Sequence, residues 1–155
     1  MKSYYTPETL ESFINSLNDL EVKERKKISK QISDAREKGD LKENAEYDAA
    51  KNAQSLLELK ISKLKSIISN AKVILKSDID NKKVSMLTKV KILNKNNNKI
   101  FTYYIVSEEE SNIKYNKLSI KSPIAQGLLG KKVGEIATVI VPAGKLDLKI
   151  LEIGF

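Results

Sequence analysis

The chain has 155 residues, of which 41% are hydrophobic and 31% charged, a composition typical of a folded protein with one ordinary domain or two small ones. It contains neither cysteine nor histidine, which excludes disulfides, thiolate or imidazole metal sites and the usual nucleophilic triads. The sequence has no apolar stretch long enough to cross a membrane and no apolar signal core at its start, so we expect a cytoplasmic protein.

The net charge of +8 comes from 28 basic and 20 acidic residues. A surplus of this size can steer a protein toward nucleic acid. All the basic residues except Arg25 and Arg36 are lysine, however, and an AT-rich genome produces such a bias without any selection for binding. Charge alone therefore leaves a nucleic-acid partner undecided.

The first half of the chain has the periodicity of two helices. Thr6-Pro7 is a typical helix start, and Gly39 is a typical helix end. Between them, apolar residues recur at steps of three and four, with a weaker stretch at residues 21–27. A second stripe runs with similar steps from Ala45 through Ala49, Ala53, Leu57, Ile61, Leu64, Ile68 and Ala71 to Leu75. Two helices of about 30 residues, each about 45 Å long, with a short link predict an antiparallel coiled-coil hairpin.

The second half changes to the period of two that is typical of strands. Strand patterns occur around residues 90–92, 100–106, 118–120, 136–141 and 146–153, with an asparagine-rich turn at 94–98 and a short helix from Ser122-Pro123 to Gly130. We therefore predict an α+β chain: a hairpin over residues 1–76 with its tip at 39–47, a linker at 77–85, and a small β-rich domain over 86–155.

The link between the two helices carries acidic residues that allow two interpretations. Asp40 and Glu43 have the spacing of a capping box, and acids at a helix start also complement its dipole by about 0.3–1 kcal/mol each. Alternatively, Mg²⁺ is usually held by one or two carboxylates together with phosphates and waters. Two carboxylates on a turn supply part of such a site and leave the rest to another molecule. The residue pattern leaves both interpretations open.

Three segments resemble signatures of the GreA/GreB family of transcript-cleavage factors. Residues 32–51 contain the tip sequence GDLKEN at 39–44, residues 70–74 resemble the end of the family's hairpin, and residues 119–134 resemble its C-terminal signature. The segments cover essentially the whole chain in the family's order and spacing. The intact tip sequence and a modest basic patch favour the GreA branch over the GreB branch.

The resemblance implies a coiled-coil hairpin followed by an FKBP-like β-rich domain. It implies that the β-rich domain docks at the rim of the RNA polymerase secondary channel while the hairpin enters that channel. The polymerase's own centre then cleaves the 3′ end of a backtracked nascent RNA, so the chain acts as an accessory factor and not as an enzyme. Asp40 and Glu43 match the two essential tip acids, which share a Mg²⁺ with the polymerase. No cofactor of its own is implied, and we expect a monomer.

The resemblance also suggests roles for further residues. Arg36 and Lys51 match the basic patch that contacts the extruded RNA, although lysine lacks the planar bidentate fork of arginine. Leu41 and Tyr47 either pack the tip or contact a partner. Ser122 and Pro123 match part of the polymerase-docking loop, and they also form an ordinary helix start.

Three functions other than transcript cleavage are compatible with parts of the sequence. A Gre-like inhibitor would occupy the channel without stimulating cleavage, but such relatives carry altered tips. A prolyl isomerase would need a cluster of aromatic residues, for which the β-rich half offers Phe101, Tyr103, Tyr104, Tyr115 and Phe155. In a plain coiled-coil or nucleic-acid-binding protein, Asp40 and Glu43 would only cap the helix.

Overall fold

The computed structural model describes residues 3–39 and 44–155, which fall into two compact units. One unit is Glu8–Ala71, and the other combines Met1–Pro7 with Lys72–Phe155. Each unit is described by itself. Asp40, Leu41 and Glu43, three residues assigned to the tip from the sequence, lie outside the described residues.

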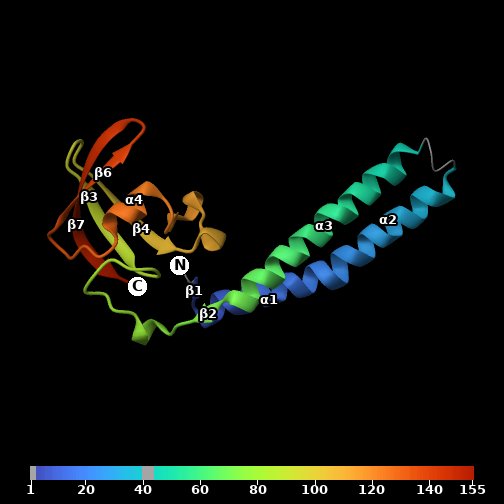
Figure 1. The fold of residues 1–155 in the computed structure, drawn as a ribbon, viewed down its shortest axis with the longest axis horizontal. Coiled ribbons are helices and arrows are strands. Elements are labelled where there is room, and N and C mark those ends of the chain that lie inside the picture. Colours follow the sequence, from blue (N-terminus) through green and yellow to red (C-terminus); the bar gives the residue numbers. More distant parts are fainter. Residues whose placement is uncertain (1–2, 40–43) are drawn as a thin grey trace. The chain divides into compact units, whose positions relative to one another are not determined.

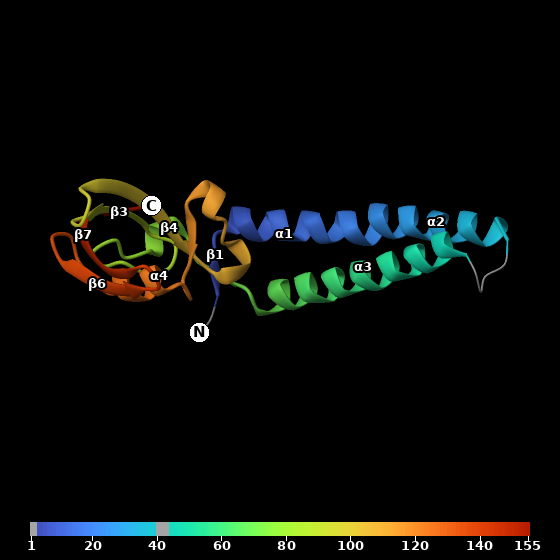
Figure 2. The same cartoon turned by 90° about the horizontal axis from the view of Figure 1, so that it is seen from above.

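The first unit is the predicted antiparallel hairpin. Its first arm consists of α1 (Pro7–Asp19), a π-helical segment η1 (Leu20–Glu24) and α2 (Arg25–Glu37), which follow one another along a single rod. The second arm is α3 (Ala45–Asn70), which runs back beside α2 and spans about 39 Å at ~1.5 Å per residue. Figures 1 and 2 show the two arms side by side in both views.

Two kinds of contact hold the arms together. Large apolar side chains fill the interface at mid-length, where Ile28, Leu57 and Ile61 are buried with Leu17, Leu20, Ile32 and Ala53 packed against them. Closer to the tip, the small residues Ala35 and Ala50 are buried instead. The sequence stripe predicted Ala45 and Ala49 for this interface, but both are exposed. Near its start, the buried face of α3 therefore contains Ala50 instead of Ala45 and Ala49.

The second arm is shorter than its apolar stripe predicted. The stripe continues to Leu75, but α3 ends at Asn70 because Ala71 adopts an extended conformation (φ −70°, ψ 139°). The chain then forms β2 (Lys72–Val73), which pairs in parallel with β1 (Tyr4–Tyr5). This pairing supplies backbone hydrogen bonds that a longer helix would otherwise provide.

The second unit is built on a mixed sheet. In the part of the chain that the structure describes, five strands have the order β5-β4-β3-β7-β6. They are β3 (Lys89–Asn94), β4 (Lys99–Val106), β5 (Lys117–Ser119), β6 (Ile136–Val141) and β7 (Gly144–Gly154). All neighbours are antiparallel except β4 and β5. Short 3₁₀ turns lie at Lys76–Asp78, Glu108–Glu110 and Ile113–Tyr115. The strands coincide with the period-two segments, so the predicted α+β fold class is confirmed.

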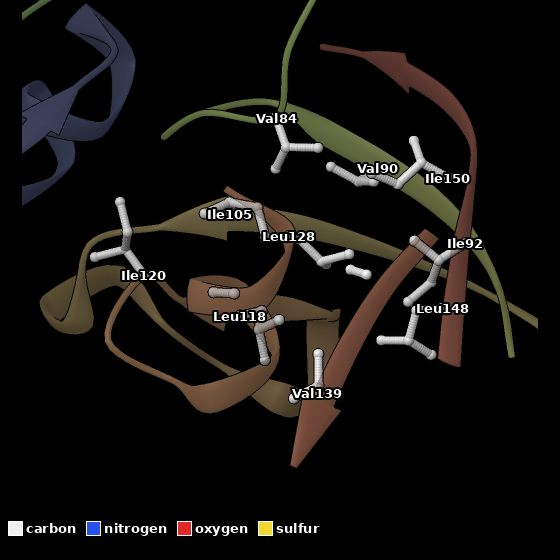
Figure 3. Packing of buried hydrophobic residues seen from close by; sticks show 12 residues of the cluster. Val84, Val90, Ile92, Ile105, Leu118, Ile120, Leu128, Val139, Leu148 and Ile150 are labelled. Carbon is white, nitrogen blue, oxygen red and sulfur yellow. The ribbon is translucent and has the colours of Figure 1, made fainter. Parts of the chain in front are cut away.

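One face of the sheet is covered by α4 (Pro123–Leu128), and the core lies between them. Side chains from all five strands and from α4 meet there, as Figure 3 shows for Val90, Ile92, Ile105, Leu128 and Ile150. Gly127 allows the close approach of α4 to β6, since a Cβ atom at this position would come within 2.5 Å of Val139 Cγ2. A side chain here would therefore require Val139 or the helix to shift.

The segment expected as a linker contributes to this second unit. Ile79 and Val84 are both buried, and Val84 belongs to the core of the sheet domain. Residues 3–7 also pack here, because β1 pairs with β2 and Tyr5 is buried. The structural units thus divide near residues 7 and 71. Among the described helices, none combines the length and the apolar character needed to span a bilayer.

Candidate functional site

The hairpin tip is flanked by two helix ends that the structure describes. The first turn of α3 is capped by Asn44, whose side-chain oxygen accepts hydrogen bonds from Glu46 N and Tyr47 N, both at 3.1 Å. Asparagine is among the best N-cap residues, because its oxygen satisfies N–H groups that have no partner within the helix. The capping-box interpretation placed the cap at Asp40, four residues too early. Helix α3 begins at Ala45, and Asn44 is its cap.

The same asparagine also contacts the end of the other arm. Its side-chain Nδ2 donates a hydrogen bond to the backbone oxygen of Ala35, in the last turn of α2. Ala35 O also accepts a hydrogen bond from Lys38 N at 3.3 Å, and its second lone pair accepts the bond from Asn44. One amide group therefore caps both helices at the base of the tip.

Two side-chain pairs bridge the arms beside Asn44. Lys38 Nζ lies 3.1 Å from Glu46 Oε2, and the guanidinium of Arg36 lies 5.8 Å from the centre of the Tyr47 ring. The lysine and the glutamate are both about 65% exposed, so their ion pair contributes roughly 0–1 kcal/mol. An exposed cation–π contact is worth about 0.5–1 kcal/mol. These pairs add modestly to the connection that Asn44 makes.

The structure brings the two predicted RNA-contacting residues to one flank of the hairpin. Arg36 is exposed and stacks over Tyr47, and Lys51 lies one helical turn beyond Tyr47 on the same face of α3. Lys51 is also exposed, and its ammonium group donates to Gln54 Oε1 at 3.1 Å. The half-buried Tyr47 thus lies between the two basic side chains. Contact of Arg36 and Lys51 with RNA remains a prediction.

Farther from the tip, an ion pair with good geometry joins the arms. Arg25 Nε and Nη2 donate to the two carboxylate oxygens of Glu58, both at 2.9 Å. The hydrogen bonds from Arg25 lower the pKa of Glu58 from its ordinary value, and they raise the pKa of Arg25. Glu58 therefore stays ionised to a lower pH than an unpaired glutamate would. The ion pair aligns α2 with α3 on a solvent-exposed face.

A complete metal site is not formed by the described residues. Among residues 3–39 and 44–155, no three carboxylates gather closely enough to hold a metal ion. The donor set assigned to Mg²⁺ from the sequence, Asp40 and Glu43, lies outside these residues. Two carboxylates match the one or two that Mg²⁺ usually takes from a protein, with other ligands coming from elsewhere. The chemistry of this donor set fits a partial magnesium site.

In the second unit, Ser122 and Pro123 begin α4. The side chain of Ser122 accepts a hydrogen bond from Ala125 N at 3.2 Å, and Pro123 occupies the first turn, where its missing N–H costs nothing. Ser122 is half-buried by this role, while Pro123 is exposed. The helix-start interpretation is therefore correct locally. It leaves the exposed ring of Pro123 available to a partner.

Four of the aromatic residues named for a prolyl-isomerase cluster lie in two places. Phe101 and Tyr103 stand opposite the buried Ile92 and Val90 on the core side of the sheet, with ring centres 6.2 Å apart. Tyr104 points the other way, because successive residues alternate along a strand. Together with Phe155 it lines a separate hollow of about 150 Å³. These described rings do not form the aromatic cluster that a prolyl isomerase needs.

Comparison with known proteins accounts for both units. A family model described as "Transcription elongation factor, N-terminal" matches residues 3–73, and one described as "Transcription elongation factor, GreA/GreB, C-term" matches residues 79–155. The chain belongs to the GreA/GreB family. It is 54% identical over 153 residues to the transcription elongation factor GreA of Amoebophilus asiaticus, covering 99% of this chain and 98% of that protein.

A second relative matches the chain over a similar length. The transcription elongation factor GreA of Christiangramia forsetii is 50% identical, covering 97% of this chain and 96% of the relative. A solved structure of GreA factor homolog 1 from Thermus thermophilus aligns over 100% of both chains at 22% identity, with a TM-score of 0.46. The resemblance that the tip and C-terminal segments suggested is confirmed by the curated relatives and family models.

The sequence interpretation missed the double role of Asn44. The sequence indicates the α3 cap, because Asn44 directly precedes the apolar stripe that begins at Ala45 and asparagine is a strong N-cap residue. That signal was overlooked because Asp40 and Glu43 matched the capping-box spacing. The bond to Ala35 has no sequence signal, because it depends on how the two arms approach each other.

Proposed function

We propose that this protein enters the secondary channel of RNA polymerase and stimulates the polymerase's own cleavage of backtracked RNA. Cleavage removes the displaced 3′ end, so an arrested complex regains a 3′ end that can be extended. The protein itself supplies side chains and no complete catalytic centre. The observation that carries the proposal is the presence of Asp40 and Glu43 at the tip of a hairpin whose chain belongs to the GreA/GreB family throughout its length.

The hairpin is suited to reaching a recessed site. Helix α3 alone extends about 39 Å, and buried apolar contacts hold it along α2. Near the tip, Ala35 and Ala50 occupy the interface in place of larger residues, which keeps that end narrow. A rod with a narrow end can deliver side chains through a channel to a centre that lies inside another protein.

The tip supplies carboxylates where a phosphodiester-cleaving centre requires them. Asp40 and Glu43 would each offer oxygen atoms to a Mg²⁺ whose other ligands belong to the polymerase and its RNA. A Mg²⁺ held there would supply positive charge against the phosphate and would make the attacking water more acidic. Arg36 and Lys51, on one flank of the tip, would hold the extruded RNA through its phosphates.

Docking at the channel rim is assigned to the second unit. Pro123 is exposed at the start of α4, and the Ser122 cap and Gly127 contact fix this helix against the sheet. A partner that packs on Pro123 would therefore meet a rigid surface. We further propose that the protein acts as a monomer, with RNA polymerase and the 3′ end of the nascent RNA as its partners.

The test uses a stalled elongation complex with labelled RNA. We expect the protein to shorten the RNA from its 3′ end, and we expect Asp40→Ala and Glu43→Ala each to slow this by at least about tenfold, or ~1.4 kcal/mol. Asp48→Ala is the matched control, because Asp48 is an exposed acid one turn into α3. Since Asn44 caps α3, neither tip variant should change thermal unfolding. Competition with labelled protein measures whether polymerase binding is retained.

Two results would contradict the proposal. If both tip variants cleave at the normal rate, the carboxylates have no part in the chemistry. If the unaltered protein blocks elongation and leaves the RNA length unchanged, the protein is a channel inhibitor.

A further inference from the structure

A hollow of about 150 Å³ lies within the second unit, apart from the core of the sheet. Tyr104 and Val106 of β4 line it, and both alternate along the strand with Ile105, which faces the core. The apolar part of the wall consists of Ile79, Leu87, Tyr104, Val106 and Phe155. Ile79 and Val106 are only 8% and 3% exposed, although neither belongs to the core cluster. A second, smaller apolar region therefore encloses the hollow.

Leu87 is held in this wall in an unusual backbone conformation. Its φ is 71°, in the left-handed region that leucine rarely adopts. Its N–H donates to Ile105 O at 2.6 Å, and Ile105 N donates to Thr88 O at 3.0 Å. These two bonds fix Leu87 beside β4, where its side chain lines the hollow. Residues held in sparsely populated conformations cluster at active sites and ligand clamps.

Positive charge surrounds the apolar wall. Lys76 is exposed at the hollow, and Lys117 lines it with a side chain that is 41% exposed. Lys89 Nζ lies 5.6 Å from the centre of the Tyr104 ring. Among the described residues, the acid that lines the hollow is Glu110, whose Oε1 lies 3.7 Å from Lys117 Nζ. Three lysines against one glutamate leave a surplus of positive charge, which favours an anionic group at the rim.

The size and the lining of the hollow select a class of ligand. An apolar cavity of about 150 Å³ accommodates a benzene-sized ring, whereas drug-sized molecules occupy about 300–1,000 Å³. We propose that the hollow binds a small aromatic carboxylate, with its ring against Leu87, Val106 and Phe155 and its carboxylate at Lys76 and Lys117. A free aromatic acid and the C-terminal residue of a peptide share this chemistry.

The binding experiment uses the full chain, labelled with ¹³C at its methyl groups and titrated with sodium phenylacetate at constant ionic strength. We expect saturable shifts at the methyl groups of Ile79, Leu87 and Val106. Acetate has the charge without the ring, and benzyl alcohol has the ring without the charge. Each should bind at least about fivefold more weakly than phenylacetate. A tripeptide that ends in phenylalanine distinguishes the sources, since tighter binding than phenylacetate assigns the hollow to a chain end and weaker binding to a free acid.

Two variants test the two ends of the ligand. Lys76→Gln should weaken phenylacetate binding about threefold and leave benzyl alcohol binding unchanged, because the lysine contacts the carboxylate at an exposed rim. Leu87→Asn should weaken the binding of both ring-bearing ligands about tenfold, because asparagine tolerates a positive φ but replaces an apolar wall with a polar group. Lys132→Gln is the matched control, an exposed lysine of the same unit that does not line the hollow. Thermal unfolding without ligand establishes that each variant is folded, and Phe155→Ala replaces Leu87→Asn if the latter is not.

Three results would overturn the inference. The first is a set of shifts spread over exposed residues and absent from the hollow's methyl groups. The second is equal binding of phenylacetate and either acetate or benzyl alcohol. The third is unchanged affinity for phenylacetate in Lys76→Gln and in the folded wall variant. Each result concerns binding by this protein alone, so the proposed function stands or fails separately.

Discussion

Tyr5 shows how a single residue connects the start of the chain with the second unit. Its side chain is only 1% exposed, and its hydroxyl donates to Glu109 Oε2 at 3.4 Å. Burial raises the pKa of Tyr5, and the charge of Glu109 adds to this while a hydrogen bond with Ser107 partly offsets it. The phenol is therefore held in its neutral form within the folded unit. Its ionisation couples to unfolding at alkaline pH.

We predict that Tyr5→Phe reduces the loss of stability at alkaline pH. Because the folded pKa of Tyr5 is raised, its contribution is fully present below the unfolded value of about 10 and is lost as pH rises through the folded value. Urea unfolding of the unaltered protein and the variant between about pH 8 and 11 measures the difference in slope. The Glu108 hydrogen bond raises the pKa of the exposed Lys121, so a small slope of the same sign should remain in the variant. Equal slopes in both proteins would mean that Tyr5 ionises as readily when folded.

At the scale of elements, the π-helical segment Leu20–Glu24 keeps the first arm in register with α3. Leu20 and Ile28 both face the interface although they are eight residues apart. In a regular α-helix, eight residues make two full turns and about 80° more, so Ile28 would be rotated away from the direction of Leu20. In the π segment, Arg25 N–H donates to Leu20 O, five residues earlier. The wider turn of the π segment contains one more residue than an α-helical turn, so Ile28 returns to the same face as Leu20. The weak stretch at residues 21–27 of the sequence pattern corresponds to this change of phase.

We predict that deleting Val22 leaves the hairpin stable. Val22 is 58% exposed within the π segment, and its removal leaves Leu20 and Ile28 seven residues apart, which suits a regular α-helix. The free energy of unfolding should change by less than about 1 kcal/mol. Helical circular dichroism during urea unfolding measures it.

Deletion of Lys30 is the matched control. Lys30 is an exposed residue of α2, so its loss would rotate Ile32 and Ala35 out of the interface and cost at least about 2 kcal/mol. If the Val22 deletion is as damaging as the Lys30 deletion, the π segment does not compensate the phase.

At the scale of the whole molecule, charge is distributed unevenly. The net charge is +8, and between residues 51 and 76 six lysines accompany a single acid, Glu58, which is paired with Arg25. Exposed lysines of this density attract a nucleic-acid-containing complex over roughly one Debye length, about 10 Å at 0.1 M salt. The sequence left open whether this bias reflects binding or genome composition.

We predict that association with a stalled elongation complex slows several-fold between about 50 and 300 mM KCl, while the cleavage rate at saturating protein changes little. Substituting glutamine for the exposed Lys60 and Lys63 should lower the association rate and weaken its salt dependence. The same substitutions at Lys82 and Lys83, exposed in the second unit, serve as the control. Stopped-flow fluorescence of labelled protein measures both rates. An association rate that is independent of salt would favour a purely compositional origin of the lysines.

The sequence by itself determined the features that depend on neighbouring residues. Apolar steps of three and four located the helices, period-two segments located β3 to β7, and Ser122 and the asparagine-rich turn acted as their local chemistry predicts, with Asn98 N donating to Asn94 O at 2.8 Å. The assignment of Asp40 and Glu43 as tip acids also comes from the sequence, through the family motif, and stays a prediction. Such signals are local because each arises from side chains within one or two turns of the backbone.

Only the tertiary structure decided the features that join distant segments. The end of α3 at Asn70 follows from the pairing of β2 with β1, whose residues are far away at the start of the chain. The contact of Asn44 with Ala35 depends on the approach of two helices whose interface is set by Ala50 and Ile61. The spacing of apolar residues does not predict these contacts. A backbone N–H or C=O group forms its hydrogen bond with whichever partner the fold brings close to it.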